Sequence, residues 1–308
     1  MPHDYSLSQT FIHQTPTHEH LIRWTRLGNP TAPPLVLIHG TPWSSFVWHG
    51  LATSLSPHYH IHLYDHPGFG TSPAPRRVAD PAAHNNDNDN AQIDLDASLV
   101  LRADATAALL KHWALPTPPH IVAHDNGGLV ALRLLLEHGI QFASLCLIDV
   151  VALGPFGGLP FFKLVADNEA VFAAIPPNFI EGLLRAYIRS ATYKPLPSAL
   201  EDVLCAPWLE EGGQGPQRFL RELVQAHCRD AGGVEDGYKS VGGRAPTKII
   251  WGREDAWIPV ETAQRLKEAL NAEEVVVVED AGHLVQYDQP GRLAVEVGLW
   301  LSKHGGKE

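Results

Sequence analysis

The sequence predicts an α/β protein in which helices cover both faces of a doubly wound, mostly parallel sheet. Continuous apolar runs such as PLVLIHG (34–40) and TKIIWG (247–252) are typical of strands that are buried on both faces. Segments with helical periodicity, such as 98–114 and 260–270, alternate with these runs along the chain. Strand patterns disappear between about 151 and 243, which indicates a helical insert over the sheet.

The elements follow one another in a regular order. Two N-terminal segments have strand character, a short helix follows Trp48, and a polar tract at 84–90 is expected to form a surface insertion. The segment 120–139 reads as a strand that turns sharply into a helix, and the chain closes with an amphipathic helix at 291–302. The remaining strands are expected at 10–16, 20–28, 58–70, 143–150 and 273–278.

These patterns divide the chain into two predicted domains. Residues 1–151 and 244–308 carry the alternating strands and helices and form the core domain. Residues 152–243 form the helical cap domain, because their apolar residues recur with helical spacing in pieces such as NFIEGLLRAYIRSA (178–191) and PQRFLRELVQAH (216–227). A covered, apolar pocket beneath such an insert suits a small hydrophobic molecule.

Composition excludes several classes of partner. A formal net charge of −11 argues against nucleic acid, which needs a basic surface. The apolar runs are too short to span a bilayer, and the N-terminus shows no secretory leader. Three widely separated cysteines, Cys146, Cys205 and Cys228, fit a reducing compartment. The sequence therefore predicts a cytoplasmic protein without a nucleic-acid or membrane partner, and it does not determine the oligomeric state.

Neither a metal nor a cofactor is expected. The stretch HEHLI (18–22) fails the zinc pattern HExxH, because Ile22 stands where the second histidine belongs. The glycine-rich stretches lack the lysine and the strand–helix context of a phosphate loop.

An aspartate occupies the turn between the strand and the helix of 120–139. Asp125 has the small residues Ala123 and Gly127 two positions before and two after it, the spacing of a nucleophile elbow. The alternative is that Asp125 caps the helix, since Asp is a preferred N-cap residue. The sequence of this turn alone does not decide between the two.

Three further segments favour the nucleophile. LVLIHGTPW (35–43) ends a buried strand, LYDHPGFGTS (63–72) contains an Asp-x-Pro-Gly-x-Gly-x-Ser turn, and 251–290 supplies an acid and then a histidine. With these motifs, the chain from about 33 to 300 apart from the insert resembles the α/β-hydrolase superfamily. It looks most like the members with an aspartate nucleophile, the epoxide hydrolases and haloalkane dehalogenases.

The resemblance implies a triad of Asp125, Asp255 and His283. Asp255 falls on the family pattern Gly-x-x-Asp, and it would orient the imidazole of His283, which follows Gly282. Asp149, at the end of an earlier strand, is a second candidate for the acid. The oxyanion hole would use the backbone N–H groups of Thr41 and Asn126.

An aspartate nucleophile restricts the chemistry. A carboxylate is anionic at neutral pH and needs no base to activate it. Against an ester or amide it would form a reactive anhydride, whereas against an electrophilic sp³ carbon it forms an alkyl ester that water then cleaves. The histidine therefore serves the second step, as the base for that water.

The leaving group is less closely determined. The stretch HGTP (39–42) resembles the HGxP sequence of epoxide hydrolases, whose ring-opening donors are cap tyrosines. Tyr187, Tyr193 and Tyr238 are the candidates, and Tyr187 is predicted to bind substrate. Both related families usually carry Trp after the aspartate, where this chain has Asn126.

The prediction is therefore an epoxide hydrolase that uses water on a small hydrophobic molecule. His39, Trp43 and Trp48, near the oxyanion loop, are expected to contribute to the substrate site. One alternative is a haloalkane dehalogenase, in which the indoles or the amide of Asn126 would bind the halide. Another is a lyase-type enzyme or a ligand receptor on the same scaffold, because the fold alone does not fix the function.

Overall fold

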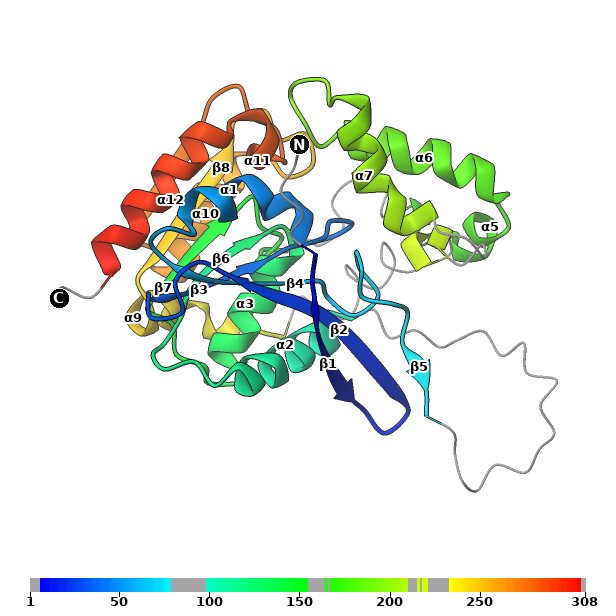
Figure 1. Ribbon diagram of the computed structural model, residues 1–308. Coiled ribbons are helices and arrows are strands. Elements are labelled where there is room, and N and C mark those ends of the chain that lie inside the picture. Colours follow the sequence, from blue (N-terminus) through cyan, green and yellow to red (C-terminus); the bar gives the residue numbers. More distant parts are fainter. Residues whose placement is uncertain are drawn as a thin grey trace.

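A single mixed sheet runs through the molecule (Figure 1). The computed structural model describes residues 6–78, 98–154, 164–165, 167–209, 215–216, 218–220 and 233–305. The strand order is β1-β2-β4-β3-β6-β7-β8-β9, with β5 paired to β2. Pairs from β4 to β9 are parallel, and those made by β2 are antiparallel, which confirms the predicted mostly parallel sheet. The strands are β1 (Gln9–Gln14), β2 (His18–Leu27), β3 (Pro34–Ile38), β4 (His60–Tyr64), β5 (Arg76–Arg77), β6 (His120–His124), β7 (Ser144–Ile148), β8 (Thr247–Gly252) and β9 (Glu274–Val278).

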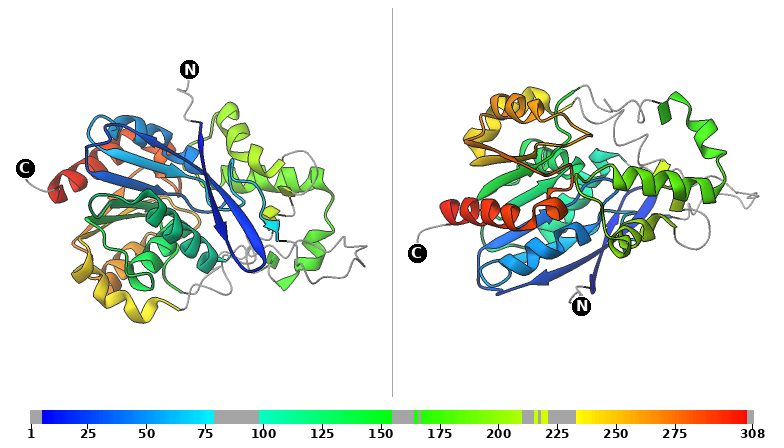
Figure 2. Two further views of the ribbon diagram at one scale, coloured as in Figure 1. Left: turned by 60° about the horizontal axis from the view of Figure 1, so that its bottom comes forward. Right: turned by 90° about the horizontal axis from the view of Figure 1, so that it is seen from above.

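Helices cover both faces of this sheet (Figure 2). One face carries α1 (His49–Leu55), α11 (Val285–Asp288) and α12 (Pro290–His304), and the other carries α2 (Leu99–Trp113), α3 (Asn126–Leu136) and α10 (Glu261–Leu270). Side chains alternate along the inner strands. In β3, Leu35 and Leu37 pack into the first layer, whereas Val36 and Ile38 pack into the second. The continuous apolar runs of the sequence therefore reflect burial on both sides.

The ends of the elements have local causes. The Ser98 hydroxyl accepts a hydrogen bond from the Leu101 amide at the start of α2, and Ala114 adopts the left-handed conformation at its end. The last helix begins at Pro290, because a proline at the first helical position loses no hydrogen bond. Strand β7 is shorter than the expected 143–150, because Asp149 has a φ of 44° and so leaves the extended conformation.

The cap helices lie at one end of the molecule, away from the C-terminal end of α12 (Figure 1). They are α5 (Glu169–Ala173), α6 (Pro177–Arg189) and α7 (Ser198–Leu209). Arg185 and Arg189 of α6 both form ion pairs with Glu201 of α7, which joins the two helices. Between 164 and 220, the residues that the structure describes contain no strand. The polar tract at 84–90, most of the helical piece at 216–227, and Cys228 lie outside the described residues.

The C-terminal end of the predicted insert differs from the observed packing. The helices η2 (Glu235–Ser240) and α9 (Val241–Arg244) pack against α3 and α10, and Tyr238 and Val241 belong to the same apolar layer as these two helices. Residues 234–243 therefore lie with the core layer, because their apolar side chains are buried there. The division of the chain into a core and a cap domain stays a prediction. No helix among the described residues is long and apolar enough to cross a membrane.

The turn between β6 and α3 is closely packed against the end of β3. A Cβ atom on Gly127 would lie 2.6 Å from the carbonyl oxygen of His39 and 2.7 Å from that of Ile38. Both neighbours are backbone atoms, which cannot rotate away. Gly127 therefore allows α3 to start directly beside the loop that follows β3, and this places the two segments in contact at the site.

We expect Gly127→Ala to lower the free energy of unfolding by about 1–3 kcal/mol, because the new methyl group overlaps a rigid backbone. The control is Gly182→Ala in α6, where a Cβ atom would meet no atom of the described residues within 4 Å. That variant is expected to gain about 0.5–1 kcal/mol, since alanine favours a helix interior over glycine. Urea unfolding of the three proteins measures both effects. Equal midpoints for Gly127→Ala and the unmodified protein would contradict the proposed contact.

Candidate active site

Asp125 stands at the turn between β6 and α3 in a conformation that few residues adopt. Its φ is 52° and its ψ is −131°, and it is 3% exposed. Within the described part of the chain its side chain makes no capping hydrogen bond to α3. The carboxylate points instead toward the loop after β3 and toward His283. The helix-cap alternative therefore does not describe this aspartate.

The three residues of the predicted triad come together at the carboxyl ends of β6, β8 and β9. Nδ1 of His283 lies 2.9 Å from Oδ2 of Asp255, and Nε2 lies 3.2 Å from Oδ2 of Asp125. The other oxygen of Asp255 accepts hydrogen bonds from the backbone N–H groups of Trp257, at 2.7 Å, and Ile258, at 3.0 Å. These two bonds fix the orientation of Asp255, which in turn fixes the imidazole.

The electrostatics favour a protonated imidazole between two carboxylates. Burial lowers the pKa of His283, but the charge of Asp255 and the hydrogen bonds to Asp125 and Asp255 outweigh it and raise the pKa to about 10. Burial also opposes ionisation of Asp125, yet the hydrogen bond and charge of His283 hold the pKa of Asp125 below its usual value. At neutral pH the pair is therefore an imidazolium and a carboxylate.

Backbone groups hold the second oxygen of Asp125. The N–H of Thr41 donates to Oδ1 at 2.7 Å, and a hydrogen bond from the N–H of Asn126 also lowers the pKa of the carboxyl. Both predicted oxyanion-hole donors thus reach this carboxylate. One carboxylate oxygen lies among backbone donors, and the other faces the imidazole.

Buried polar side chains stabilise the loop that carries Thr41 through hydrogen bonds. Asp65, from the turn after β4, accepts from the Ser45 amide at 2.8 Å and from the Thr71 amide at 2.7 Å. Arg102 of α2 donates to the Thr41 hydroxyl at 2.9 Å and is 2% exposed. The Asp-x-Pro-Gly-x-Gly-x-Ser turn therefore supports the loop after β3.

His39 is fully buried at the start of the loop after β3, and its predicted substrate-binding role stays a prediction. Its Nδ1 lies 2.9 Å from the carbonyl oxygen of Gly40, and its Nε2 accepts from the His66 amide at 3.0 Å. Burial lowers the pKa of His39 to about 4, so the ring is neutral. Because both nitrogens are used by backbone groups, the ring holds the loop in place.

An aromatic wall surrounds the imidazole. Trp257 stacks on His283, with ring centroids 4.6 Å apart, and on Tyr187 of α6 at 4.2 Å. Trp43 stacks on Trp257 at 5.7 Å, and Trp48 meets the ring of His124 edge-on at 6.2 Å. The predicted residues Trp43 and Tyr187 therefore join one stack at the site, through a tryptophan that the sequence analysis missed. Trp257 lies two residues after Asp255 in the sequence, and this position could have identified it as a site residue.

The other candidate residues lie differently. Tyr193 is 51% exposed, and the Tyr238 hydroxyl donates to the carbonyl oxygen of Ala152 at 2.6 Å within the core. Oδ1 of Asp149 accepts from the Gly252 amide at 2.8 Å. Burial and the charge of Asp255 raise the pKa of Asp149 well above its usual value. Asp255 is therefore the acid that contacts His283, with its Oδ2 at 2.9 Å from Nδ1.

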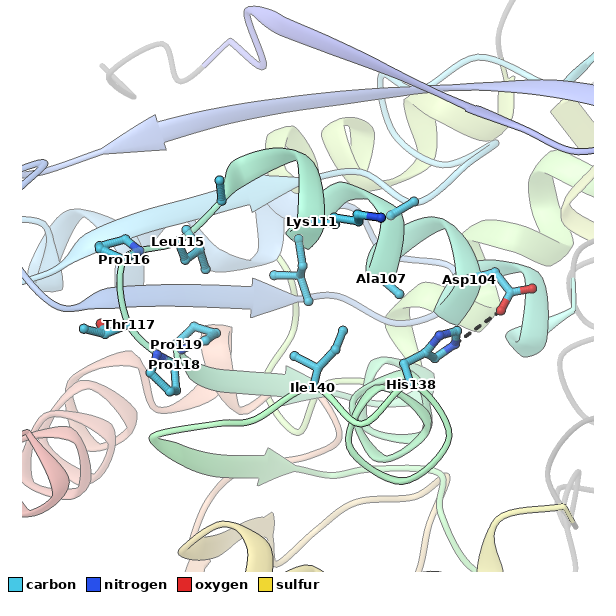
Figure 3. Close-up of a pocket in the computed structure, with 13 residues that line it drawn as sticks. Asp104, Ala107, Lys111, Leu115, Pro116, Thr117, Pro118, Pro119, His138 and Ile140 are labelled. Carbon is cyan, nitrogen blue, oxygen red and sulfur yellow. Dashed lines mark ion pairs between the residues drawn. The ribbon is translucent and has the colours of Figure 1, made fainter.

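A separate pocket of about 730 Å³ lies between α2, the loop that leads to β6, and the segment after α3 (Figure 3). Alanine, leucine and proline side chains form most of its lining, and an ion pair between His138 and Asp104, 3.2 Å apart, stands at one end. The residues of the triad are not among those that line it. Among the described residues, no group of histidine, cysteine or acidic side chains has the arrangement of a metal site.

Comparison with known proteins places this arrangement in a family. The model of the alpha/beta hydrolase family matches residues 35–297. This chain belongs to that family. The predicted superfamily and fold are therefore confirmed, and the chain is an α/β hydrolase, whereas the aspartate-nucleophile branch is not decided by the match.

Relatives of this α/β hydrolase differ in activity. It is 34% identical over 265 residues to a pimeloyl-[acyl-carrier protein] methyl ester esterase of Aeromonas hydrophila, covering 82% of this chain and 88% of the esterase. An α/β-hydrolase-fold protein from Burkholderia ambifaria is 33% identical, with a TM-score of 0.79 over 96% of this chain and 99% of that one. Haloalkane dehalogenase DbeA from Bradyrhizobium elkani is 17% identical, with a TM-score of 0.68 over 96% and 99% of the two chains, and shares the fold.

We expect Asp125→Asn to lower the pKa of His283 from about 10, because the substitution removes one of the two negative charges that stabilise the imidazolium. NMR titration of the His283 ring measures this pKa. Asp149→Asn is the matched control, because the charges and hydrogen bonds that raise the pKa of His283 come from Asp255 and Asp125, and it should leave the value nearly unchanged. Equal shifts in both variants would show that Asp125 carries no special charge at this site.

Proposed function

We propose that this α/β hydrolase acts through a covalent ester on Asp125. The observation that carries this proposal is the placement of one buried carboxylate at the elbow. Its Oδ1 accepts from the Thr41 amide at 2.7 Å, and its Oδ2 faces Nε2 of His283 at 3.2 Å. An ionised oxygen at the usual place of a nucleophile is ready to attack without losing a proton.

The first step is attack by Oδ2 of Asp125 on an sp³ carbon. The new carbon–oxygen bond forms an alkyl ester as the leaving group takes the electron pair of the bond that breaks. Attack on a carboxylic ester would produce an anhydride instead, which is a poor intermediate. The carboxylate at the elbow therefore favours an alkyl electrophile over the ester substrates named for some relatives.

The second step is hydrolysis of that ester. Esterification removes the charge of Asp125, which is one of the interactions that raise the pKa of His283. The imidazolium then passes its proton to solvent water more readily, and the neutral ring accepts a proton from the water that attacks the ester. Attack of this water on the ester carbonyl places negative charge on an oxygen of Asp125, where the N–H groups of Thr41 and Asn126 stabilise it. Asp255 keeps the imidazole oriented throughout.

The geometry supports an epoxide as the substrate. Tyr187 projects from the cap helix α6 into the aromatic stack, and its phenol interacts with the charges of Asp125 and Asp255. Burial and these two charges raise the pKa of Tyr187 well above its usual value, so the hydroxyl keeps its proton at neutral pH and is available as a donor. A neutral phenol beside the nucleophile suits the oxygen of a strained ring. The tryptophans of the wall favour a small hydrophobic molecule.

A haloalkane is the second candidate. The side-chain amide of Asn126 is buried, and among the described residues neither its nitrogen nor its oxygen has a hydrogen-bond partner. The indole N–H of Trp43 is likewise buried without a partner in the described part of the chain. Two buried donors near the nucleophile suit a departing halide. Neither substrate class requires a cofactor or a metal.

We expect His283→Gln to react once with a substrate and then stop, because the histidine is needed only to activate water. Intact-protein mass spectrometry after incubation with a panel of epoxides and haloalkanes should show one substrate-sized adduct, and peptide mapping should place it on Asp125. His112→Gln, on the surface helix α2, is the control and should turn over without accumulating an adduct. Steady-state turnover by His283→Gln at the unmodified rate would contradict this role. The lack of an adduct or product with either class would support the lyase or receptor alternative.

The Tyr187→Phe variant distinguishes an epoxide from a haloalkane as the substrate class. With epoxides we expect formation of the ester to slow by about 100-fold or more, because the ring oxygen loses a proton donor. With haloalkanes the rate should change little, since a halide needs no proton. Trp43→Phe is the reciprocal variant, and it removes an indole N–H while keeping an aromatic ring. Single-turnover measurements with each substrate class give both rates, and slowing of the halide reaction by Tyr187→Phe would reject the epoxide assignment of the tyrosine.

A further inference from the structure

The loop that carries His283 is bound to the cap on both sides of the histidine. On one side, the Leu284 amide donates directly to the carbonyl oxygen of Ala191 at 2.9 Å. On the other side, the Gly282 amide donates to Oδ2 of Asp288 at 2.8 Å. Ala191 belongs to the segment 190–194, which follows α6 and leads toward α7. The proposed base is therefore held between two anchored neighbours.

Asp288, at the end of α11, joins the two segments. The same Oδ2 that accepts from Gly282 also accepts from the Tyr193 amide at 2.8 Å, and Oδ1 accepts from the Lys194 amide at 2.9 Å. The residue is 5% exposed. One buried carboxylate therefore binds the histidine loop and the cap segment at once, through hydrogen bonds that its charge strengthens.

The two segments touch closely at this point. A Cβ atom on Gly282 would lie 2.8 Å from the backbone nitrogen of Tyr193 and 3.0 Å from the carbonyl oxygen of Ala191. The indole N–H of Trp257 also donates to the Ser190 hydroxyl at 2.9 Å, and this indole stacks on His283. The cap segment thus contacts the loop that carries His283, and it also contacts the indole of Trp257, which stacks on the imidazole.

We propose that Asp288 is a positioning residue that holds His283 in place for hydrolysis of the ester by locking its loop to the cap segment 190–194. This inference rests on the proposed function, because it assigns Asp288 to the second step of that reaction. Attack by Asp125 uses no base and tolerates a displaced imidazole. Activation of water depends on the place of Nε2, and a misplacement of about 1 Å can cost about 100-fold in rate.

Asparagine at this position is a nearly isosteric test. All three groups that face the carboxylate are N–H donors, so the amide oxygen of Asp288→Asn can accept at one end only. The NH₂ group at the other end then faces a donor, and at least one of the three hydrogen bonds is lost. The connection between the histidine loop and the segment 190–194 is therefore weakened, while the volume of the side chain is kept.

The experiment measures both steps in a single turnover, by mass spectrometry of quenched samples that follow the ester on Asp125. In Asp288→Asn we expect ester hydrolysis to slow by about 10-fold or more, formation to change by less than about 3-fold, and the ester to accumulate. Asp202→Asn is the matched control, because that carboxylate accepts from Arg185 within the cap at 2.8 Å and lies away from the histidine loop. It should leave both steps unchanged.

A second variant keeps the test valid where Asp288→Asn does not fold. Ser190→Ala removes the acceptor of the Trp257 N–H without disturbing a buried carboxylate, and should slow ester hydrolysis in the same selective way, by a smaller factor. The proton on Nδ1 of His283 provides an independent readout, since its NMR resonance should shift or broaden in Asp288→Asn and stay unchanged in Asp202→Asn.

The outcomes separate the two proposals. If the unmodified protein and His283→Gln form no ester, the proposed function fails, whatever Asp288 does. If the ester forms and Asp288→Asn hydrolyses it at the unmodified rate, only the role of Asp288 is overturned. An equal fall in both steps, matched by a loss of folded protein, would also overturn it and would leave Asp288 a purely structural residue.

Discussion

The charged histidine between two buried carboxylates is the constraint on which the rest of the site depends. Burying charges is costly unless every one of them is compensated. Here the imidazole lies between Asp125 and Asp255, and the remaining carboxylate oxygens accept backbone N–H groups from Thr41 and from the segment after Asp255. These donors come from separate loops at one edge of the sheet. The parallel strands must therefore end in register for the charges to be satisfied.

The same arrangement explains why the protonation of His283 changes during the proposed reaction. In the free protein both carboxylates raise its pKa, and burial opposes them. An ester on Asp125 removes one charge and leaves the burial, so the balance moves toward the neutral ring that can act as a base. A serine at the elbow would carry no charge to remove. The ionised nucleophile thus also sets when the base becomes active.

Residues of α6 and of the segment after it contact the proposed site directly. Tyr187 reaches the aromatic wall from α6, and the segment 190–194 binds the loops on which His283 and Trp257 are carried. In the proposed reaction, selection of the substrate and positioning of the base therefore both involve these cap residues. In the core, Asp65 has a role comparable to that of Asp288. Its carboxylate accepts hydrogen bonds that connect the turn after β4 to the loop after β3. Buried carboxylates that accept backbone N–H groups fix both loops.

The sequence by itself determined the mostly parallel sheet, and it predicted the turn at Asp125 and the chain order of the proposed triad, because burial on two faces and a tight turn restrict residue type locally. Short motifs also identified Thr41 and Asn126, whose backbone groups depend on position and not on side chain. Only the tertiary structure decided that His39 turns inward and that Trp257 stacks on the base. Such contacts join segments far apart in the chain, and side-chain direction at their meeting depends on all of the surrounding packing.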